Sequence, residues 1–484
     1  MNTAIYNTTP PTIDWLMVMP TLVVLATGVL AFMVMMLQKK KDNMFILVSG
    51  LAGLAVAAFA VKQNFGQGDG STFAEMVMRD NVSLMLQLTL IVIAFVTLLF
   101  SESYLRQKHI AFREFYPLVL WATAGGMIMV STRNMLMMFI GLEVLSISLY
   151  ILAGMSRYEA KSEESAIKYF LLGAFASAFL LYGMAMVYGA TGSVHLDAIN
   201  AVLGTGKPFA ANLVTFGLMF ILIALSFKCA FVPFHQWTPD VYQGAPTNVT
   251  AFMAAASKVA AVAAVYRIFD AAPSHLKWLI PAFSVIAILT MTIPNLMALV
   301  QKDVKRVLGY SSISNAGYVL VAVLASHRAS AGSMVLFLVN YSVMTLGVFA
   351  VISLCAKQGK EGTSFDDLKG LAKRSPFAGA ALIIFVASLI GVPPTGGFFG
   401  KLAIFQDALT ADMVPLAIAL AINSAISVYY YLRIVLAAFV QDEEEGVEQL
   451  PANGMVKTAV GLCALGVISL MFLVSPIANL YTRS

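Results

Sequence analysis

The sequence predicts an all-α membrane protein that crosses the bilayer about fourteen times. Two observations support this class. Of the 484 residues, 60% are hydrophobic and only 11% are charged, whereas a soluble domain needs about 25% charged residues to cover its surface. Apolar runs of about 18 or more residues also recur along the chain, and each can cross a hydrocarbon core about 30 Å thick. A water-soluble protein is therefore excluded, and we expect a polytopic membrane protein.

The apolar segments, taken in order, set the expected helices and domains. The expected spans are 15–37, 44–62, 82–101, 115–131, 134–154, 165–189, 212–237, 247–269, 277–299, 304–325, 332–356, 376–409, 412–438 and 456–481. They group into an N-terminal segment of three helices at 1–110, a unit of helices four to eight at 115–270, a unit of helices nine to thirteen at 277–438, and an acidic loop with a last helix at 439–484. The first apolar run, from Leu16, has no basic segment before it and is too long for the apolar core of a signal peptide. We therefore expect it to be a true span.

Lysine and arginine residues are distributed unequally between the two sets of connections. The connections after odd-numbered spans hold 19 of the 30, and the opposite connections and the termini hold 8. The first set should therefore face the cytoplasm or its organellar equivalent, with both termini on the outer side. The net charge of +5 reflects this topology and does not indicate nucleic-acid binding. The acidic segment 441–448 is expected to be a solvated loop, with docking to a basic partner as the alternative.

The three cysteines, Cys229, Cys355 and Cys463, lie far apart, within or at the ends of expected spans. Their spacing is not that of metal ligands, and we interpret them as small buried apolar residues. The sequence also contains no glycine-rich nucleotide-binding motif. We expect neither a metal site nor a cofactor-binding site in this chain.

Four charged residues fall inside the expected spans. They are Lys228, Lys258, Lys401 and Glu143, and Glu143 is the only carboxylate deep in any expected span. Each such charge costs at least about 2.5–3.5 kcal/mol at a helix centre. One carboxylate cannot neutralise three ammonium groups, so the surplus lysines must be hydrated or lose their protons. The set therefore predicts a proton relay, and a structural ion pair that locks two helices together is the alternative.

Two of the spans contain prolines that should interrupt the helix. Pro233 and Pro239 bracket FHQWT, and Pro393 and Pro394 stand among glycines in GVPPTGGFFG. Proline removes a backbone donor and clashes with the preceding turn. Non-helical backbone at membrane depth occurs only where it is buried in protein or lines a hydrated cavity. Paired discontinuous helices are also typical of transporters built from inverted repeats.

An internal repeat is indicated by EVLSISLYILAG at 143–154, which loosely matches RVLGYSSISNAGYVL at 306–320. A broken span follows each segment at the same offset, so we expect two inverted five-helix repeats, each with a discontinuous helix and a nearby lysine. His235 lies just past the first break and either shuttles protons, because imidazole titrates near neutrality, or is an ordinary hydrogen-bonded histidine. Lys168 is expected to be an interfacial anchor, with tuning of Glu143 as the alternative.

Two further groups of polar and aromatic residues are given structural roles. Tyr310, Ser311, Ser312 and Ser314 are expected to satisfy backbone groups or hold waters. The segment VYYYLR at 428–433 is expected to form an interfacial aromatic belt with an arginine anchor.

Three segments carry a resemblance to one family. SFKCAFVPFHQWTPDVYQGAPTNVTAFMAAASKVAA, KRVLGYSSISNAGY and GVPPTGGFFGKLAIF resemble the antiporter-like, proton-translocating subunits of NADH:quinone oxidoreductase (respiratory complex I), whose relatives include multisubunit cation/proton antiporters. The resemblance covers roughly residues 100–440, with the motifs in the family's order. In FHQWTPDVYQGAP the chain resembles the subunit N branch, the counterpart of mitochondrial subunit 2, more than the larger sister subunits.

The resemblance implies roles for all four intramembrane charges. An essential glutamate matches Glu143, a lysine on the first broken span matches Lys228, a central lysine matches Lys258 and a terminal lysine matches Lys401. It implies a translocase subunit that pumps protons, driven by quinone reduction elsewhere, in the inner or cytoplasmic membrane. NADH, FMN, iron–sulfur clusters and quinone would belong to partner subunits, and the partners would include the sister antiporter-like subunits.

Two alternatives to this function remain. The first is a subunit of a multisubunit cation/proton antiporter without redox coupling, although TPDVYQGAP argues against it. The second is a purely structural scaffold within a larger membrane assembly.

Overall fold

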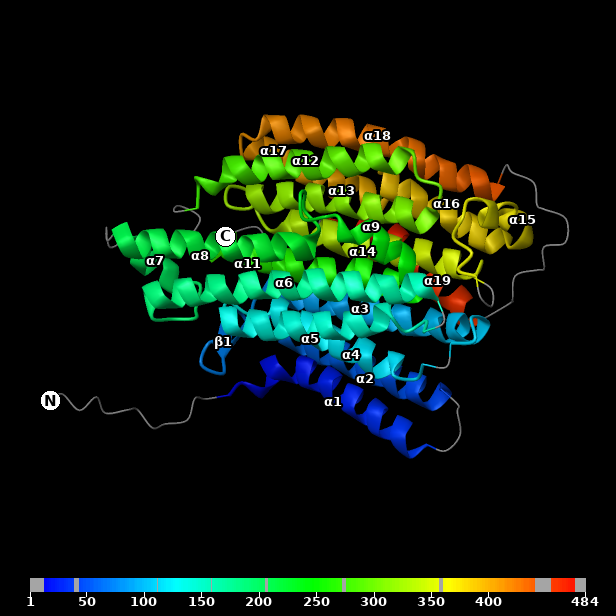
Figure 1. The fold of residues 1–484 in the computed structure, drawn as a ribbon, viewed down its shortest axis with the longest axis horizontal. Coiled ribbons are helices and arrows are strands. Elements are labelled where there is room, and N and C mark those ends of the chain that lie inside the picture. Colours follow the sequence, from blue (N-terminus) through cyan, green and yellow to red (C-terminus); the bar gives the residue numbers. More distant parts are fainter. Residues whose placement is uncertain are drawn as a thin grey trace.

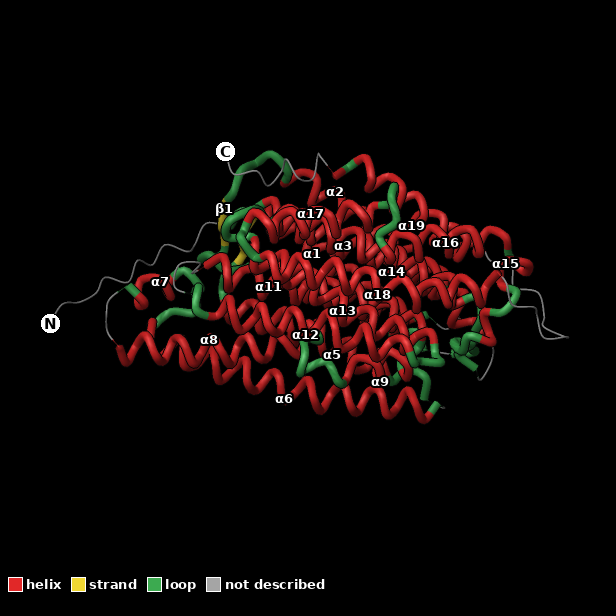
Figure 2. Tube along the Cα trace, turned by 90° about the horizontal axis from the view of Figure 1, so that it is seen from above, coloured by secondary structure: helices red, strands yellow, loops and turns green. Residues whose placement is uncertain are grey.

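The chain folds into a bundle of roughly parallel helices (Figures 1 and 2). The computed structural model describes residues 13–38, 43–110, 112–157, 159–204, 208–271, 276–356, 360–439 and 454–474. The helices of the first half are α1 (Trp15–Leu37), α2 (Met44–Asn64), α3 (Asn81–Gln107), α4 (Phe115–Val130), α5 (Met135–Ala153), α6 (Ala160–Thr191), α7 (Ala198–Leu203), α8 (Pro208–Cys229), α9 (Trp237–Gly244), α10 (Thr247–Phe252) and α11 (Lys258–Ala271). Those of the second half are α12 (Leu279–Leu299), α13 (Val304–Ala325), α14 (Gly332–Ser353), α15 (Leu371–Arg374), α16 (Pro376–Ile390), α17 (Gly396–Thr410), α18 (Val414–Phe439) and α19 (Gly454–Phe472).

Three minor elements complete the described chain. An antiparallel hairpin joins β1 (Gly70–Thr72) to β2 (Val77–Arg79) between α2 and α3. A π-helical turn, η1 (Met253–Ser257), separates α10 from α11, and a 3-10 turn, η2 (Asp366–Leu368), precedes α15. None of these elements was expected from the sequence.

The predicted fold class, an all-α multi-pass membrane protein, is confirmed. Twelve helical segments among the described residues are long and apolar enough to cross a membrane, or thirteen if one bent pair counts as a single span. The other two expected spans coincide with shorter helices. The first is α4, with 16 residues, and the second is the pair α16 and α17, with 15 residues each. The division into two inverted repeats stays a prediction.

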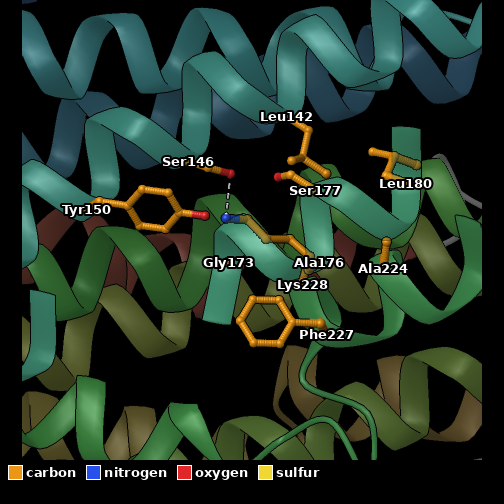
Figure 3. A pocket seen from close by; sticks show the side chains of 10 residues that line it. All are labelled: Leu142, Ser146, Tyr150, Gly173, Ala176, Ser177, Leu180, Ala224, Phe227 and Lys228. Carbon is orange, nitrogen blue, oxygen red and sulfur yellow. Dashed lines mark hydrogen bonds between the residues drawn. The ribbon is translucent and has the colours of Figure 1, made fainter. Parts of the chain in front are cut away.

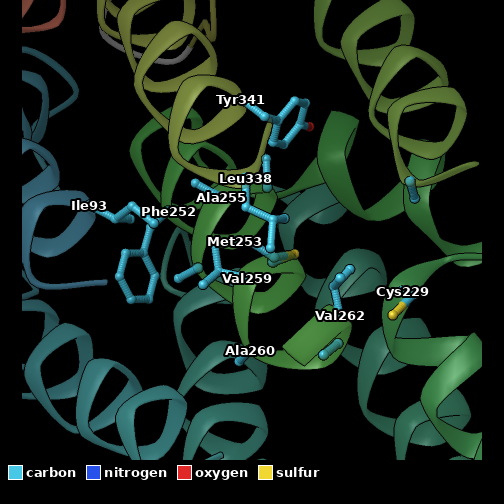
Figure 4. Close-up of a cluster of buried hydrophobic side chains, with 14 of the residues drawn as sticks. Ile93, Cys229, Phe252, Met253, Ala255, Val259, Ala260, Val262, Leu338 and Tyr341 are labelled. Carbon is cyan, nitrogen blue, oxygen red and sulfur yellow. The ribbon is translucent and has the colours of Figure 1, made fainter. Parts of the chain in front are cut away.

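Three spans form the centre of the bundle. The most apolar stretches of Thr247–Ala271 and Val304–Ala325 are 100% buried, and that of Gly332–Ser353 is 89% buried, against 39% for α1, α2, α12, α18 and α19. Figure 4 shows apolar side chains at this centre, including Met253 of η1 and Val259 of α11 together with Leu338 of α14. A charge on α11 therefore lies far from lipid and bulk water, inside protein.

The two ends of the bundle carry separate groups of ionic contacts. At the start of α3, Asp80 accepts hydrogen bonds from Arg267 at 2.5 and 2.9 Å. At the end of α3, Lys108 pairs with Glu159 at 2.5 Å and with Glu361 at 3.1 Å. The connections that follow α3, α5 and α14 thus meet at one end, as alternate crossing requires. Which end faces the cytoplasm stays a prediction.

Both predicted breaks are confirmed. The helix α8 ends at Cys229 and α9 begins at Trp237, while α16 ends at Ile390 and α17 begins at Gly396. The Val232–Pro233 and Pro393–Pro394 peptide bonds within the breaks are cis. Pro239, expected to flank the first break, instead lies in the first turn of α9. Proline is tolerated there because the N–H groups of a first turn have no intrahelical acceptor.

The structure corrects two further expectations. Within VYYYLR, Tyr430 and Tyr431 are each only 1% exposed, and only Tyr429, at 60%, faces outward. The segment is therefore not an aromatic belt, because the bundle buries the face of α18 that carries the rings of Tyr430 and Tyr431. In addition, α3 continues past the expected limit at residue 101 and includes Glu102, which is buried and pairs with Arg106. A spanning helix thus carries a carboxylate, Glu102, that is more deeply buried than the half-buried Glu143.

The remaining expectations about position concern the cysteines and the C-terminal part of the chain. Cys229, Cys355 and Cys463 are buried, as predicted, and none of the three forms a disulfide. The acidic segment 441–448 and the end of the last expected span lie outside the described residues.

Candidate functional site

The three predicted lysines lie inside the bundle, on three different helices. Lys228 is in the last turn of α8, Lys258 is the first residue of α11, and Lys401 is in α17. Lys228 and Lys258 are each 4% exposed and Lys401 is 6% exposed. Glu143, on α5, is half-buried and accepts a hydrogen bond from Ser177 Oγ on α6.

Lys228 occupies a small pocket between α5, α6 and α8 (Figure 3). Its Nζ donates hydrogen bonds to Ser146 Oγ at 2.7 Å and to Tyr169 OH at 3.1 Å. It also lies 5.0 Å and 5.5 Å from the ring centres of Tyr169 and Tyr150. Hydroxyl oxygens and aromatic faces both stabilise the ammonium form without supplying a fixed counter-charge.

Lys228 lines this pocket, whereas Glu143 reaches it only through its hydrogen bond with Ser177. Ser177, which donates to Glu143, lines the pocket together with Ser146, which lies one helical turn beyond Glu143 on α5. Among the described residues no ion pair joins Glu143 to Lys228. The structural ion pair that we kept as the alternative is therefore not formed between these two charges, each of which instead has a serine as its hydrogen-bond partner.

Lys258 follows the π-helical turn at the centre of the bundle. Its Nζ donates to Ser312 Oγ at 2.6 Å and also to the Ser312 carbonyl oxygen, and it lies 4.7 Å from the ring centre of Tyr341. The Tyr341 hydroxyl donates to the same Ser312 Oγ at 2.8 Å. Irregular π turns within helices frequently occur at functional sites. Ser312, to which we gave a structural role, is thus a direct partner of the central lysine.

Lys401 binds the end of the helix that precedes its own. Its Nζ donates to the carbonyl oxygens of Leu389 and Ile390 at 2.9 and 2.8 Å, and to Ser424 Oγ at 3.0 Å. The last carbonyls of a helix lack intrahelical donors and carry partial negative charge. The break between α16 and α17 is therefore what creates a binding place for this ammonium group. Lys401 Nζ also lies 5.2 Å from the ring centre of Tyr318.

Gly391 at this break allows a direct test of the Lys401 geometry. Its φ is +88°, and a Cβ there would lie 3.2 Å from Lys401 Cδ. We expect Gly391→Ala to cost about 1–2 kcal/mol for the left-handed backbone and to displace Lys401. The melting temperature of the purified protein should decrease. Gly189→Ala is the control, because the nearest atom to its added Cβ is Leu213 Cδ2 at 3.8 Å. Wild-type behaviour of Gly391→Ala would show that the position of Lys401 does not depend on this turn.

The two secondary candidates lie away from the lysines. Lys168 pairs with Asp240 at 2.9 Å and with Glu164 at 2.6 Å, and its side chain is 41% exposed. It makes no contact with Glu143 among the described residues, and its role as an interfacial anchor stays a prediction. His235 lies half-buried in the first break, and its Nδ1 has no hydrogen-bond partner among the described residues.

The sequence analysis missed a buried ionic cluster at one end of α13. Glu361 accepts hydrogen bonds from Tyr104 OH at 2.6 Å and Thr247 Oγ1 at 2.7 Å, and it pairs with Lys305 at 3.2 Å and with Lys108. Both lysines had been counted as loop residues, yet the structure buries them. Their long sequence separation from Glu361 leaves no local pattern to detect. The cluster links α3, α10 and α13.

Acid should weaken this cluster. Burial alone would raise the pKa of Glu361, but the Lys305 and Lys108 ammonium groups and two hydrogen bonds outweigh it and lower the pKa from 4.5 to about 2. A carboxyl group whose pKa is lower in the folded state contributes stability above its unfolded value. We expect that contribution to be complete above about pH 5 and to be lost as the pH falls toward 2.

The Glu361→Gln variant tests the same cluster at neutral pH. It leaves the buried Lys305 without a carboxylate and Lys108 with Glu159 alone, so we expect a loss of about 3–5 kcal/mol in the free energy of unfolding. The melting temperature of the purified assembly measures it, and Glu164→Gln, at an exposed ion pair, is the control. Equal melting temperatures for both variants would contradict a stabilising role for the cluster.

The chain is similar to proteins of one family along most of its length. Residues 132–427 match the family model described as NADH:quinone oxidoreductase/Mrp antiporter, transmembrane. A relative from Trichlorobacter lovleyi, NADH-quinone oxidoreductase subunit N, is 36% identical over 456 residues, covering 94% of this chain and 93% of the relative.

Solved structures agree with this relationship. A chain of respiratory complex I from Thermus thermophilus with bound aureothin is 34% identical, with a TM-score of 0.81, covering 95% of this chain and 98% of that one. A chain of the Mrp complex from a Dietzia species has a TM-score of 0.83 at 19% identity, covering 97% of this chain and 96% of that one, which shows a shared fold alone. This chain therefore belongs to the NADH:quinone oxidoreductase/Mrp antiporter transmembrane family, and within it to the subunit N proteins of NADH-quinone oxidoreductase.

Proposed function

We propose that this chain is a proton-translocating subunit of the membrane arm of NADH:quinone oxidoreductase, and that Glu143, Lys228, Lys258 and Lys401 form its proton relay. One observation carries the proposal. The three lysines are buried within the bundle, and among the described residues none of them forms an ion pair with a carboxylate. Four charges that served only to lock helices together would be paired.

The surroundings of each lysine suit reversible protonation. Burial in protein disfavours a charged amine, whereas hydroxyl oxygens, carbonyl oxygens and aromatic faces favour it. These opposing effects leave the protonated and neutral forms close in free energy. A small change in a neighbouring charge can then decide which form each amine adopts.

In this proposal the relay begins at Glu143 and Lys228. The Glu143 charge favours the ammonium form of Lys228 across Ser146 and Ser177. When a neighbouring subunit draws the Glu143 charge away, Lys228 releases its proton toward Lys258. Lys401 then passes a proton to the outer side of the membrane. The half-buried position of Glu143 leaves it open to such a neighbour.

In the same proposal, the energy for proton pumping comes from a reaction outside this chain. Quinone reduction occurs in partner subunits, which hold NADH, FMN, the iron–sulfur clusters and quinone, and the sister antiporter-like subunits adjoin this one. The location is the inner or cytoplasmic membrane, with both chain termini on the outer side. The similarity to subunit N proteins of NADH-quinone oxidoreductase supports the assignment to this complex.

Affinity purification from mild detergent tests the assignment, with NADH:quinone activity assayed in the same preparation. We expect recovery with many subunits, iron–sulfur protein and activity. Recovery alone, or only with small antiporter subunits, would replace redox-driven pumping by cation-driven proton exchange. If pumping stays intact after all four relay charges are removed, a structural scaffold would be the remaining interpretation of this chain.

A further inference from the structure

An apolar cavity lies on the side of the bundle, on helices other than those that carry the four relay charges. Four helices form it. Both α2 and α19 pack against α3, and α14 packs against α3 and α19. The cavity has a volume of about 380 Å³, and it is open to the outside of the bundle, because Val92 of α3 and Leu462 of α19 are 40% and 43% exposed. We call it the side groove, and its lining residues include Ala55, Ala58, Val92, Phe95, Leu462 and Gly466.

Small residues on two helices leave this space open. Ala55 and Ala58 on α2 and Gly466 on α19 present at most a methyl group to the side groove. At Gly466 an added Cβ would lie 2.9 Å from Val343 Cγ1, so the glycine also allows α19 to approach α14 closely. The hollow therefore follows from small side chains on helices that are distant in the sequence.

The wall of the side groove is apolar throughout. Its side chains are aliphatic or aromatic, apart from Gly466 and the thiol group of Cys463. An empty space beside such a wall forfeits the dispersion contacts that a filled space would make. At about 30 Å³ for each water-sized group, the cavity has room for about a dozen methylene groups. The occupant that fits is a single hydrocarbon chain.

A cation lies above the side groove on α2. Lys62 is in the last turn of this helix and is exposed. It follows Ala58 by four residues and Ala55 by seven, so all three share one face of the helix. Among the described residues its ammonium group forms no ion pair. Phosphate groups of lipids lie at the membrane surface and attract lysine side chains there.

The depth of the side groove matches one leaflet of a bilayer. Its lining residues on α2 extend to Leu54, which lies eight residues before Lys62. Eight residues of α-helix rise about 12 Å, whereas half of the hydrocarbon core is about 15 Å thick. A lipid chain that starts beside Lys62 therefore reaches the far end of the side groove without leaving its own leaflet.

We propose that the side groove binds one phospholipid, with its phosphate group beside Lys62 and one acyl chain in the cavity. This inference goes beyond the proposed function, because it does not involve the relay. A helix of a neighbouring subunit is the competing occupant. A helix is about 10–12 Å across with its side chains, so it could cover the cavity but could not fill it.

Photo-crosslinking in the whole assembly tests the inference. The assembly is reconstituted into vesicles of phosphatidylethanolamine and phosphatidylglycerol, and part of the phosphatidylglycerol carries a diazirine near the end of one acyl chain. After irradiation, mass spectrometry of the peptides locates the attached lipid. Attachment is measured on α3, which none of the variants below alters, and we expect it at Val92 and Phe95.

The first pair of variants tests the cavity. Ala55→Leu places a larger side chain in the side groove, and we expect it to lower attachment on α3 by about tenfold, because the leucine and the acyl chain cannot share the space. Ala52→Leu, at an exposed alanine of α2 that does not line the side groove, is the control and should match the wild type.

The second pair of variants tests the recognition of phosphate. Lys62→Gln should lower attachment by about fivefold, the expected effect of losing one lysine at the membrane surface. Lys457→Gln, at an exposed lysine of α19, is the control and should match the wild type. Melting temperatures measured in parallel show whether each variant keeps its fold, and Lys62→Gln repeats the test if Ala55→Leu does not.

Three outcomes would overturn the inference. Equal attachment in the wild type, Ala55→Leu and Lys62→Gln would mean that α3 meets only the surrounding bilayer. Attachment that falls in Ala55→Leu and is unchanged in Lys62→Gln would mean that a chain is held without its phosphate group. An absence of lipid on α3 in the wild type would mean that protein covers the side groove.

Discussion

Replacing Lys258 by methionine should leave the assembly intact and interrupt proton movement through this subunit. Methionine is similar in length to the lysine side chain and can pack against the buried apolar side chains around α11. It cannot hold a proton between Lys228 and Lys401, so we expect the transfer step to slow by roughly 100-fold or more. Proton uptake by vesicles, recorded together with quinone reduction, measures the loss.

A lysine away from the centre is the matched control for that variant. Lys457, exposed on α19, also lies in a spanning helix, and Lys457→Met should pump like the wild type. Undiminished pumping by Lys258→Met would confine any relay to the Glu143 and Lys228 half of the chain. Loss of the assembled subunit would instead show that the Ser312 contacts are structural, and Lys258→Arg would then test the charge alone.

Replacing Glu143 by glutamine should reduce pumping without unfolding the chain. The amide oxygen still accepts the hydrogen bond of Ser177, so the contact between α5 and α6 is retained. The negative charge that acts on Lys228 is removed, and the trigger of the relay is lost with it. We expect a lower proton-to-electron ratio at an unchanged melting temperature.

Glu164→Gln is the control for the Glu143 variant, because Glu164 forms an exposed ion pair with Lys168. Equal ratios in Glu143→Gln and the wild type would remove Glu143 from the relay. A large fall in melting temperature with an unchanged ratio would support the structural-pair alternative instead.

The parts of the site that the sequence predicted depend on local chemistry. Proline in a helix interior removes a backbone donor and crowds the preceding turn, so both discontinuous spans could be predicted from Pro233 and Pro393, although Pro294 lies inside α12. A charge in an apolar run is visible in the sequence whatever its partner, which is why Lys228, Lys258 and Lys401 could be identified.

The parts that the sequence did not predict depend on contacts between distant residues. Glu361 meets Tyr104 across 257 positions, and no periodicity records such a pairing. Tyr430 and Tyr431 were assigned to the membrane interface because aromatic rings beside an arginine are common there. Their burial follows from the packing of α18 against α12 and α13, which a single helix does not reveal.

The most direct test of the relay compares three single variants, Lys228→Met, Lys258→Met and Lys401→Met, with the wild type in vesicles. The measured quantity is the proton-to-electron ratio of the whole assembly at matched rates of quinone reduction. Because the lysines act in series, the account predicts that all three variants lower the ratio by the same amount. An unchanged ratio in all three would contradict the relay.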